Sequence, residues 1–354
     1  MMMIRIRLCG MALSALLATA AGAQPPYEFF AMDTAMVKKL GTPLERSDVE
    51  MLAALGYRGV APIASDQAAW EHLTEKLIPL LDEKKLKLYA IYSSVRVDRS
   101  VIETDPGIKQ NLAALKGRGT IIWLPITSKD FKPSDPAGDS MAVTAVQEVA
   151  DAAARYGLSV SLYPHFGNLM ERVEDAVRIA EKSGRENVGV TFNLCHWLRT
   201  DGPDSMARVL KLALPRLSLV TINGADRNGH DWGQLIQPLG RGDFDIGELL
   251  AELKRLGYRG PIGLQGYDVA NHLGIEPSDN LRRSMAAWKD YGKGSRRKMA
   301  LAQKARWAKI KGEAEPPTPA PAPKPKRKLS AAGRKAIIAA TKKRWAAVRA
   351  AKKA

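Results

Sequence analysis

Short runs rich in β-branched and aromatic residues alternate with helical stretches along most of this chain, and this alternation constrains the fold more than any other feature. The helical stretches, such as 139–157 and 170–184, repeat apolar residues at helical spacing and end in glycine. The β-rich runs cover residues 27–33, 56–63, 86–94, 120–126, 158–165, 188–196, 217–226 and 261–267. Strands that alternate with helices usually pair in parallel, so the sequence predicts an α/β protein.

The number of these units indicates how the sheet is arranged. Eight βα units in about 270 residues fit a closed (β/α)₈ barrel, the TIM barrel. An open doubly wound sheet is the alternative, and the sequence favours it less because no glycine-rich phosphate loop follows the first strand.

The formal charge of +17 is concentrated in the C-terminal tail. Residues 292–354 contain 20 Lys and Arg but two Asp and Glu, whereas the other 291 residues hold 34 basic and 35 acidic residues. Within the tail, the Pro-rich segment 312–328 predicts an extended, disordered linker between two basic, Ala-rich helices. These helices, 296–311 and 334–349, share an Arg-Trp-Ala motif at Trp307 and Trp345. Basic side chains with an interleaved indole are typical of polyanion binding or of helices at a membrane interface.

The N-terminus has the pattern of a bacterial export signal. Arg5 and Arg7 precede a short apolar stretch, and Ala21-Gly22-Ala23 supplies small residues for cleavage. We therefore expect a signal peptide at 1–23, a barrel at 24–291 and the basic tail at 292–354, in a protein exported to the periplasm or beyond the cell. An exported chain would rarely meet chromosomal nucleic acid, so we expect the tail to bind an anionic envelope surface, a polysaccharide or extracellular DNA. Cleavage leaves Cys195 as the single cysteine, which excludes an intrachain disulfide.

Strand periodicity predicts which side chains point into the barrel at the end where TIM barrels carry their sites. Val160 and Leu162 belong to an outward apolar set, and so do Val190 and Phe192 of the next strand. The same rule sends Ser218, Val220, Ile222, Ile262 and Leu264 outward. The predicted inner rim is polar and uncharged: Tyr163, Asn193, Asn223 and Gln265.

Residues 192–198, FNLCHWL, place a thiol beside an imidazole. Neighbouring side chains diverge on an extended chain, so Cys195, expected inward, and His196 do not form a nucleophile pair by themselves. Cys195 is more typical of a small buried apolar residue. If the strand ends near Asn193, His196 turns into the pocket instead.

Several stretches of the chain resemble one family. LYPHFG, VGVTFNLCHWL, VTINGAD, LIQPLGRGDFD and GYRGPIGLQGY are similar to motifs of the sugar phosphate isomerase/epimerase group of xylose isomerase-like TIM barrels. The resemblance covers about Tyr27 to Tyr291. It implies a divalent metal (Mn, Zn or Mg) on the inner rim, held by Glu, Asp, His and Glu from strands five to eight, with the two Glu moving a proton beside a carbonyl.

Matched to this chain, the four ligand positions fall on Tyr163, Asn193, Asn223 and Gln265. None of them carries a charge, and an amide cannot accept a proton near neutral pH, so the sequence assigns no metal ligand.

His165 and His196 fall on histidines that commonly accompany the family's ligands. Together with Asp226 they are the candidate acid/base residues, and Asp33 ends the first strand. His165 and Asp226 also have simpler interpretations, as a loop cap and as a turn residue.

A rim of amides suits a neutral polyol, because amides both donate and accept hydrogen bonds. The candidate ligand-binding residues are therefore Tyr163, Asn193, Asn223, Gln265 and Trp197. Further aromatic residues near strand ends are Trp123, Trp232 and Tyr267, and core packing explains each of them equally well. Arg199, Arg241 and Lys129 lie on predicted loops of the same face, where they would meet a phosphate or carboxylate, or remain solvated.

These observations leave three hypotheses. The first is an exported isomerase/epimerase-like barrel that binds a carbohydrate-like ligand, with the family's metal ligands replaced by neutral residues. The second is an active sugar isomerase, epimerase or lyase with an unusual metal site that uses His165 and His196. The third is a scaffold whose basic tail binds polyanions or the cell envelope.

Overall fold

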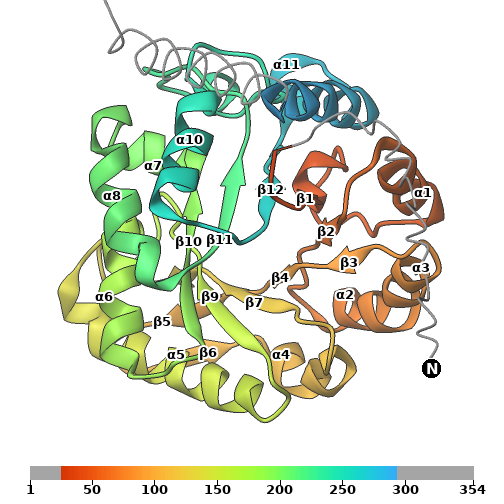
Figure 1. The fold of residues 1–354 in the computed structure, drawn as a ribbon. Coiled ribbons are helices and arrows are strands. Elements are labelled where there is room, and N and C mark those ends of the chain that lie inside the picture. Colours follow the sequence, from red (N-terminus) through yellow and green to blue (C-terminus); the bar gives the residue numbers. More distant parts are fainter. Residues whose placement is uncertain (1–24, 293–354) are drawn as a thin grey trace, which may run out of the picture. The chain divides into compact units, whose positions relative to one another are not determined.

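The computed structural model describes residues 25–292, and these form a β-barrel surrounded by helices (Figure 1). The predicted signal peptide (1–23) and nearly all of the predicted tail (292–354) lie outside the described residues. Among residues 25–292, no helix is long and apolar enough to cross a membrane. The barrel strands are β1 (Phe29–Met32), β2 (Gly59–Ala61), β3 (Lys87–Leu88) with β4 (Ala90–Tyr92), β7 (Ile121–Leu124), β9 (Ser159–Leu162), β10 (Val188–Asn193), β11 (Leu217–Ile222) and β12 (Ile262–Leu264).

All neighbouring barrel strands are parallel, and the pairing continues around the barrel. The order is β3-β2-β1-β12-β11-β10-β9-β7-β4, so the first and last strands of the chain lie side by side. The segment 87–92 completes the barrel, because β3 pairs with β2 and β4 pairs with β7. The predicted (β/α)₈ TIM barrel, with its eight β-rich runs, is confirmed.

The helices pack around the outside of the barrel, and local sequence signals set their ends. α6 ends at Gly184 and α10 at Gly257, and both glycines adopt the left-handed conformation that favours this residue. The α-helices are α1 (Arg46–Leu55), α2 (Gln67–His72), α3 (Ile78–Glu83), α4 (Pro106–Asn111), α5 (Asp139–Ala154), α6 (Val173–Ser183), α7 (Leu194–Thr200), α8 (Met206–Ala213), α9 (Trp232–Leu235), α10 (Ile246–Leu256) and α11 (Val269–Leu273). A last helix, 277–292, packs Trp288 on the ring of Phe29 at a centroid distance of 4.1 Å.

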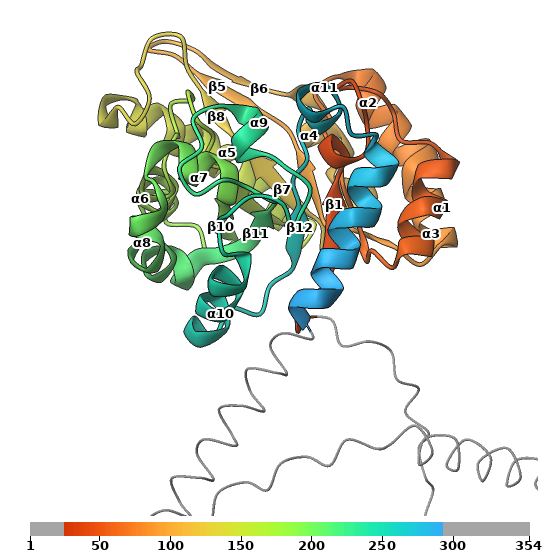
Figure 2. The same ribbon diagram turned by 90° about the horizontal axis from the view of Figure 1, so that it is seen from above.

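The two ends of the barrel differ. The loops that follow the strands carry α9, α11 and a small sheet of β5 (Val95–Val97), β6 (Ile102–Thr104) and β8 (Ile126–Thr127) at one end, while helix 277–292 finishes at the other (Figure 2). Any site built from the carboxyl-terminal strand ends therefore lies at the end of the barrel that carries α9 and α11.

Two apolar layers stabilise the barrel. The larger one lies between strands and helices and includes Val160, Val190 and Ile262. The smaller one fills the barrel interior with Phe30, Met32, Ala61, Tyr89, Ala90, Trp123, Tyr163 and Leu219. Inside the barrel, Trp123 Nε1 donates to Thr191 Oγ1 at 2.7 Å, so the buried indole N–H has a partner.

The predicted strand periodicity holds, with two corrections. Ser218 was expected to face outward, but a register irregularity between Val190 and Thr191 brings its hydroxyl within 2.7 Å of the buried Ser161 Oγ. Cys195 was expected inward on a strand, but β10 ends at Asn193 and Cys195 lies on α7, in the outer apolar layer. The strand stops there because Asn193 caps α7 by accepting from the His196 backbone N–H.

Candidate functional site

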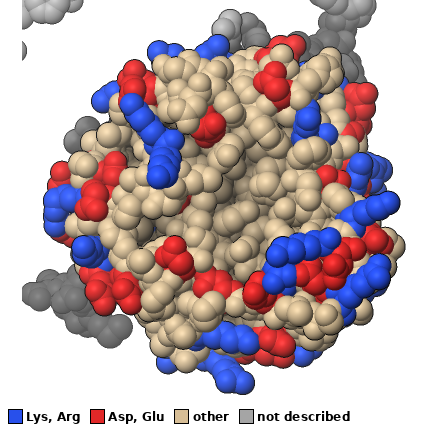
Figure 3. All heavy atoms as spheres, turned by 180° about the vertical axis from the view of Figure 1, so that it is seen from behind, with Lys and Arg blue, Asp and Glu red and all other residues tan. Residues whose placement is uncertain are grey.

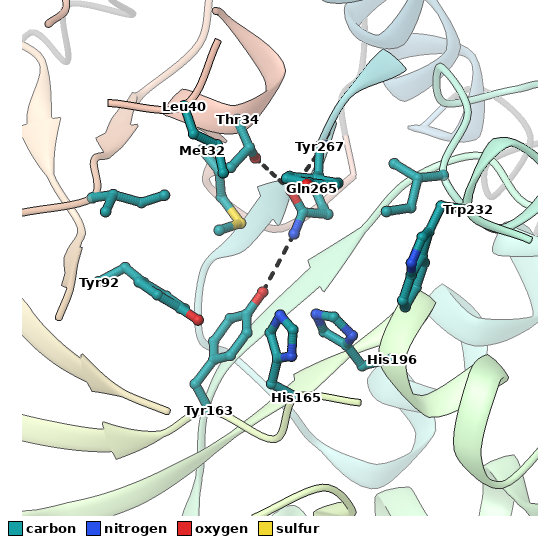
Figure 4. A pocket seen from close by; sticks show the side chains of 12 residues that line it. Met32, Thr34, Leu40, Tyr92, Tyr163, His165, His196, Trp232, Gln265 and Tyr267 are labelled. Carbon is teal, nitrogen blue, oxygen red and sulfur yellow. Dashed lines mark hydrogen bonds between the residues drawn. The ribbon is translucent and has the colours of Figure 1, made fainter. Parts of the chain in front are cut away.

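A cavity of about 310 Å³ opens at the carboxyl-terminal ends of the barrel strands (Figure 4). Its lining contains no Asp, Glu, Lys or Arg. The lining residues are Met32, Thr34, Leu40, Ile63, Tyr92, Tyr163, His165, His196, Trp232, Ile236, Gln265 and Tyr267. Four of the predicted site residues, Tyr163, His165, His196 and Gln265, are therefore brought together.

Figure 3 shows the face opposite to that of Figure 1, and its hollowed centre is free of acidic and basic side chains. The charged residues lie around the rim. The cavity therefore favours a neutral ligand, because nothing in its lining compensates a buried charge.

Tyr163 is the hub of a hydrogen-bond network behind the cavity. Its hydroxyl oxygen accepts from Asn193 Nδ2, and from Gln265 Nε2 at 3.4 Å. Burial raises the pKa of Tyr163 well above its ordinary value, so the phenol stays protonated. Because two amides already donate to this oxygen, the phenol's own hydrogen is left to donate to a ligand.

Gln265 is held from both ends of its amide. Its Oε1 accepts from Thr34 Oγ1 and from the Gly266 backbone N–H at 2.9 Å, while its Nε2 points at Tyr163 (Figure 4). The side chain is almost fully buried. The Tyr267 backbone N–H also donates to this oxygen at 3.3 Å, so Oε1 already has three donors and little capacity for a ligand.

Asn193 and Asn223 are fully buried and are not part of the cavity lining. Asn193 Oδ1 accepts from Cys195 Sγ at 3.0 Å besides capping α7. Asn223 Nδ2 donates to the carbonyls of Gly224 and Leu235, both at 2.7 Å, so it fastens the loop after β11 to α9. Both amides thus bond to groups of the protein itself, although the buried Asn223 Oδ1 has no partner within residues 25–292.

These residues do not fit a divalent metal. At the four positions matched to the family's ligands, the donors are a protonated phenol and three amides, and Asn193, Gln265 and Tyr163 are bonded to one another. Within residues 25–292, no three His, Cys, Asp or Glu side chains gather closely enough to hold a metal ion. A hard cation needs anionic oxygen ligands to offset its lost hydration, and this lining offers none.

His165 and His196 lie side by side, with ring centroids 4.0 Å apart. His165 Nδ1 is 2.9 Å from the Phe166 carbonyl and must donate to it, which leaves Nε2 as an acceptor. His196 Nδ1 accepts from the Phe166 backbone N–H at 3.4 Å, which leaves its Nε2 as the donor. The pair thus offers the cavity one proton acceptor and one proton donor.

Both imidazoles are neutral near pH 7. Burial lowers the pKa of His165, and burial together with the neighbouring His165 lowers the pKa of His196 well below its ordinary value. A neutral imidazole can accept or donate a hydrogen bond without adding a charge to the apolar cavity.

The aromatic candidates divide between lining and core. Trp232 and Tyr267 line the cavity, and Trp232 packs edge-on against His196 at a centroid distance of 5.6 Å. Trp197 lies in the outer layer, where its Nε1 donates to Ser205 Oγ at 2.9 Å, and Trp123 fills the barrel interior. The last two are packing residues.

The remaining candidates lie outside the lining. Asp226 is half-buried in the loop after β11, where its backbone carbonyl closes a turn with Gly229 N–H. Burial raises the pKa of Cys195 to about 12, so its thiol stays protonated. Arg199 donates to the His230 carbonyl and lies over the ring of Phe166. Lys129 and Arg241 are likewise absent from the lining.

Sequence reasoning missed about half of the lining. The periodicity rule, extended to the first and third strands, places Met32 and Tyr92 on the inner rim. Leu40, Ile63 and Ile236 belong to loops and to a helix end, and no periodic pattern marks them.

Comparison with known proteins agrees with this architecture. The family model of the xylose isomerase-like TIM barrel matches residues 49–291. An uncharacterized protein of Methanocaldococcus jannaschii is 28% identical over 127 residues, which are 35% of this chain and 42% of that protein. The chain thus matches less than half the length of this curated relative.

Two solved structures illustrate the fold. A D-allulose 3-epimerase from Methylomonas sp. is 20% identical, with a TM-score of 0.57 over 76% of this chain and 99% of that one. A 3-keto-D-glucoside 4-epimerase from E. coli is 18% identical, with a TM-score of 0.57 over 75% of this chain and 99% of that one. At such identities the likeness shows the fold alone. The family model, which spans more than half of the chain, shows that this protein belongs to the xylose isomerase-like TIM barrel family.

Proposed function

We propose that the barrel binds a neutral, carbohydrate-like small molecule in the cavity at its strand ends, and does so without a divalent metal. The observation that carries the proposal is the lining itself. It has no formally charged carboxylate or cation, yet Tyr163, His165 and His196 direct hydrogen-bonding groups into it.

The polar groups match what a sugar presents. Tyr163 and His196 supply two donors, and His165 supplies an acceptor, so one hydroxyl can both donate and accept across the pair. Tyr92, Trp232 and Tyr267 add aromatic rings to a wall that also contains the apolar side chains of Met32, Leu40, Ile63 and Ile236. A small number of polar groups within apolar and aromatic walls is typical of pockets that orient a small molecule.

The family resemblance and the fold neighbours support the ligand class. Both neighbours named above are epimerases of sugar derivatives by their descriptions. The proposed departure from the family is the metal, because the neutral positions at Tyr163, Asn193, Asn223 and Gln265 form hydrogen bonds within the protein instead.

The histidine pair favours a second candidate, metal-free proton transfer on the bound ligand. His165 Nε2 would accept a proton and His196 Nε2–H would donate one, on rings 4.0 Å apart. Deuterium incorporation next to the carbonyl of D-fructose or D-allulose in D₂O, followed by NMR with EDTA present, tests this candidate. Incorporation that His165→Gln abolishes supports it, and none in the wild type contradicts it.

Ligand binding is tested by titrating the EDTA-treated full chain with D-glucose, D-galactose, D-mannose, D-fructose and D-allulose, followed by calorimetry. We expect saturable binding of at least one sugar. Trp232→Leu should weaken it by about three- to tenfold, the worth of one aromatic contact. Trp197→Phe is the matched control, because Trp197 lies outside the lining, and it should leave the affinity unchanged. Absence of binding to every sugar would refute the proposal.

Export and the role of the tail remain proposals that rest on sequence alone. Determining the N-terminus of the protein after expression with its native leader tests cleavage behind Ala23. Deleting residues 292–354 and measuring retention on heparin and on anionic vesicles tests whether the tail binds polyanions.

A further inference from the structure

A second cavity, of about 500 Å³, lies beside the first. Leu40, Ile63 and Tyr92 line both cavities. The second cavity lies between the loop that follows β1 and the helix formed by α2, η2 (Leu73–Leu77) and α3. No predicted site residue lines it except Asp33, which the sequence places at the end of the first strand.

Asp33 is the exceptional residue of this cavity. It is 6% exposed, and its Oδ2 accepts from the Ile63 backbone N–H at 2.7 Å. Its Oδ1 is buried and has no hydrogen-bond partner within residues 25–292. A buried carboxylate oxygen without a partner costs free energy, and such an oxygen indicates a missing donor.

The raised pKa of Asp33 reflects the free-energy cost of burying its charged form. Burial raises the pKa of Asp33 to about 6, which outweighs the opposing effect of the backbone amides of Ile63, Thr34 and Asp33 itself. Of the other titratable side chains of the cavity, Asp66 and His72 are engaged in hydrogen bonds with the backbone, and Tyr92 is the third. Asp66 caps α2 through the Ala69 N–H at 2.9 Å, and His72 Nε2 is 2.9 Å from the Leu44 carbonyl.

The rest of the wall is mostly apolar, with Leu40, Leu44, Ile63, Leu73 and Leu77 prominent. The last two belong to η2, a π-helical turn within an otherwise continuous helix, and such turns occur frequently at functional sites. The cavity therefore suits a weakly polar group that brings one hydrogen-bond donor.

We propose that the second cavity is a subsite for the second ring of a glycoside, an apolar ring whose single hydroxyl donates to Asp33 Oδ1. The inference rests on the proposed function, because the sugar ring of the same molecule would occupy the first cavity. Because Tyr92 and Ile63 line both cavities, rings bound in the two cavities would lie next to each other. The proposed ligand is therefore a glycoside with two rings rather than a simple sugar.

The test uses the full chain and the methyl, phenyl and 4-hydroxyphenyl glycosides of the hexose that binds most tightly in the titration above. We expect the 4-hydroxyphenyl glycoside to bind at least about tenfold more tightly than the methyl glycoside, with the phenyl glycoside between them. Asp33→Asn should remove the advantage of the hydroxyl and leave the affinity for the methyl glycoside unchanged. Asp245→Asn, which caps α10 elsewhere and retains a capping side chain, is the matched control.

A steric variant makes the test independent of Asp33. Ala68 is exposed and lines the second cavity, so Ala68→Phe should fill it without disturbing the core. The affinities for the aryl glycosides should then fall to that of the methyl glycoside. Equal affinities of all three glycosides for the wild type would overturn the subsite while leaving the proposed function intact. If no hexose binds, both proposals fail.

Discussion

Polar side chains at different strand ends of the barrel differ in whether their hydrogen-bonding atoms have partners. Tyr163, Asn193 and Gln265, at the ends of β9, β10 and β12, are neutral, and both amides donate to the Tyr163 hydroxyl. At the end of β1, Asp33 is a carboxylate that is almost as deeply buried, and one of its oxygens has no partner.

This difference separates polar groups that complete the fold from those that await a ligand. In this network the phenol oxygen and both amide oxygens accept hydrogen bonds, so it stabilises the barrel, and the Tyr163 O–H is left to face the cavity. The Asp33 carboxylate weakens the fold and is consistent with a group retained for binding. Mutating the Tyr163 network should therefore lower the free energy of unfolding, whereas mutating Asp33 should raise it.

The largest effect is expected for Tyr163→Phe. It leaves Asn193 Nδ2 and Gln265 Nε2 buried without their acceptor, at a cost of about 2–4 kcal/mol in the free energy of unfolding. Urea denaturation at pH 7.5 measures the loss. Tyr92→Phe is the matched control, since no hydrogen bond of the Tyr92 hydroxyl is seen within residues 25–292, and it should cost less than about 0.5 kcal/mol. Equal losses in both variants would contradict the network.

Asp33→Asn should stabilise the protein instead. With a pKa raised to about 6, the carboxylate is ionised and buried above that pH, and it takes up a proton as the pH falls toward 4. The gain should be about 1–3 kcal/mol at pH 8 and should vanish near pH 4. Urea denaturation at both values measures it. A loss of stability at pH 8 would show that Oδ1 has a partner in solution.

The histidine pair gives a smaller effect with the opposite pH dependence. Since burial lowers both histidine pKa values, the unfolded chain binds protons below about pH 6.5 that the native barrel does not. In an Asp33→Asn background, the free energy of unfolding should fall as the pH drops from 6.5 to 5.5, by up to about 1 kcal/mol for His196. His196→Gln should flatten this slope, and His230→Gln, on an exposed loop, should not. If the slope were unchanged in the His196→Gln variant, the His196 imidazole of the wild type would have to be exposed to water.

The sequence predicted the barrel because alternation and periodicity are local signals. Val160, Val190 and Ile262 face the helices as expected, and Tyr163 and Gln265 face the interior. The sequence left open whether the strand ends at Asn193, because an Asn residue can either continue a strand or cap a helix. The bulge near Ser218 depends on its neighbour strand and has no local signal.

The second cavity could not be predicted from the chain alone. Asp33 was recognised as a strand-end residue, but its missing partner depends on the packing of Ile63 and the loop around Leu40, which come from other parts of the chain. Long-range packing decides whether a buried carboxylate is satisfied, and no spacing rule contains that information.

The central claim is that the site works without a metal, and calorimetric titration of the full chain with its best-binding hexose tests this most directly. The titration is run on EDTA-treated protein and repeated with Mn²⁺, Zn²⁺ or Mg²⁺ added, with metal content measured by elemental analysis. We predict the same dissociation constant in every condition and no stoichiometric metal. Ligand binding that EDTA abolishes, or a stoichiometric metal that His196→Ala removes, would contradict the account.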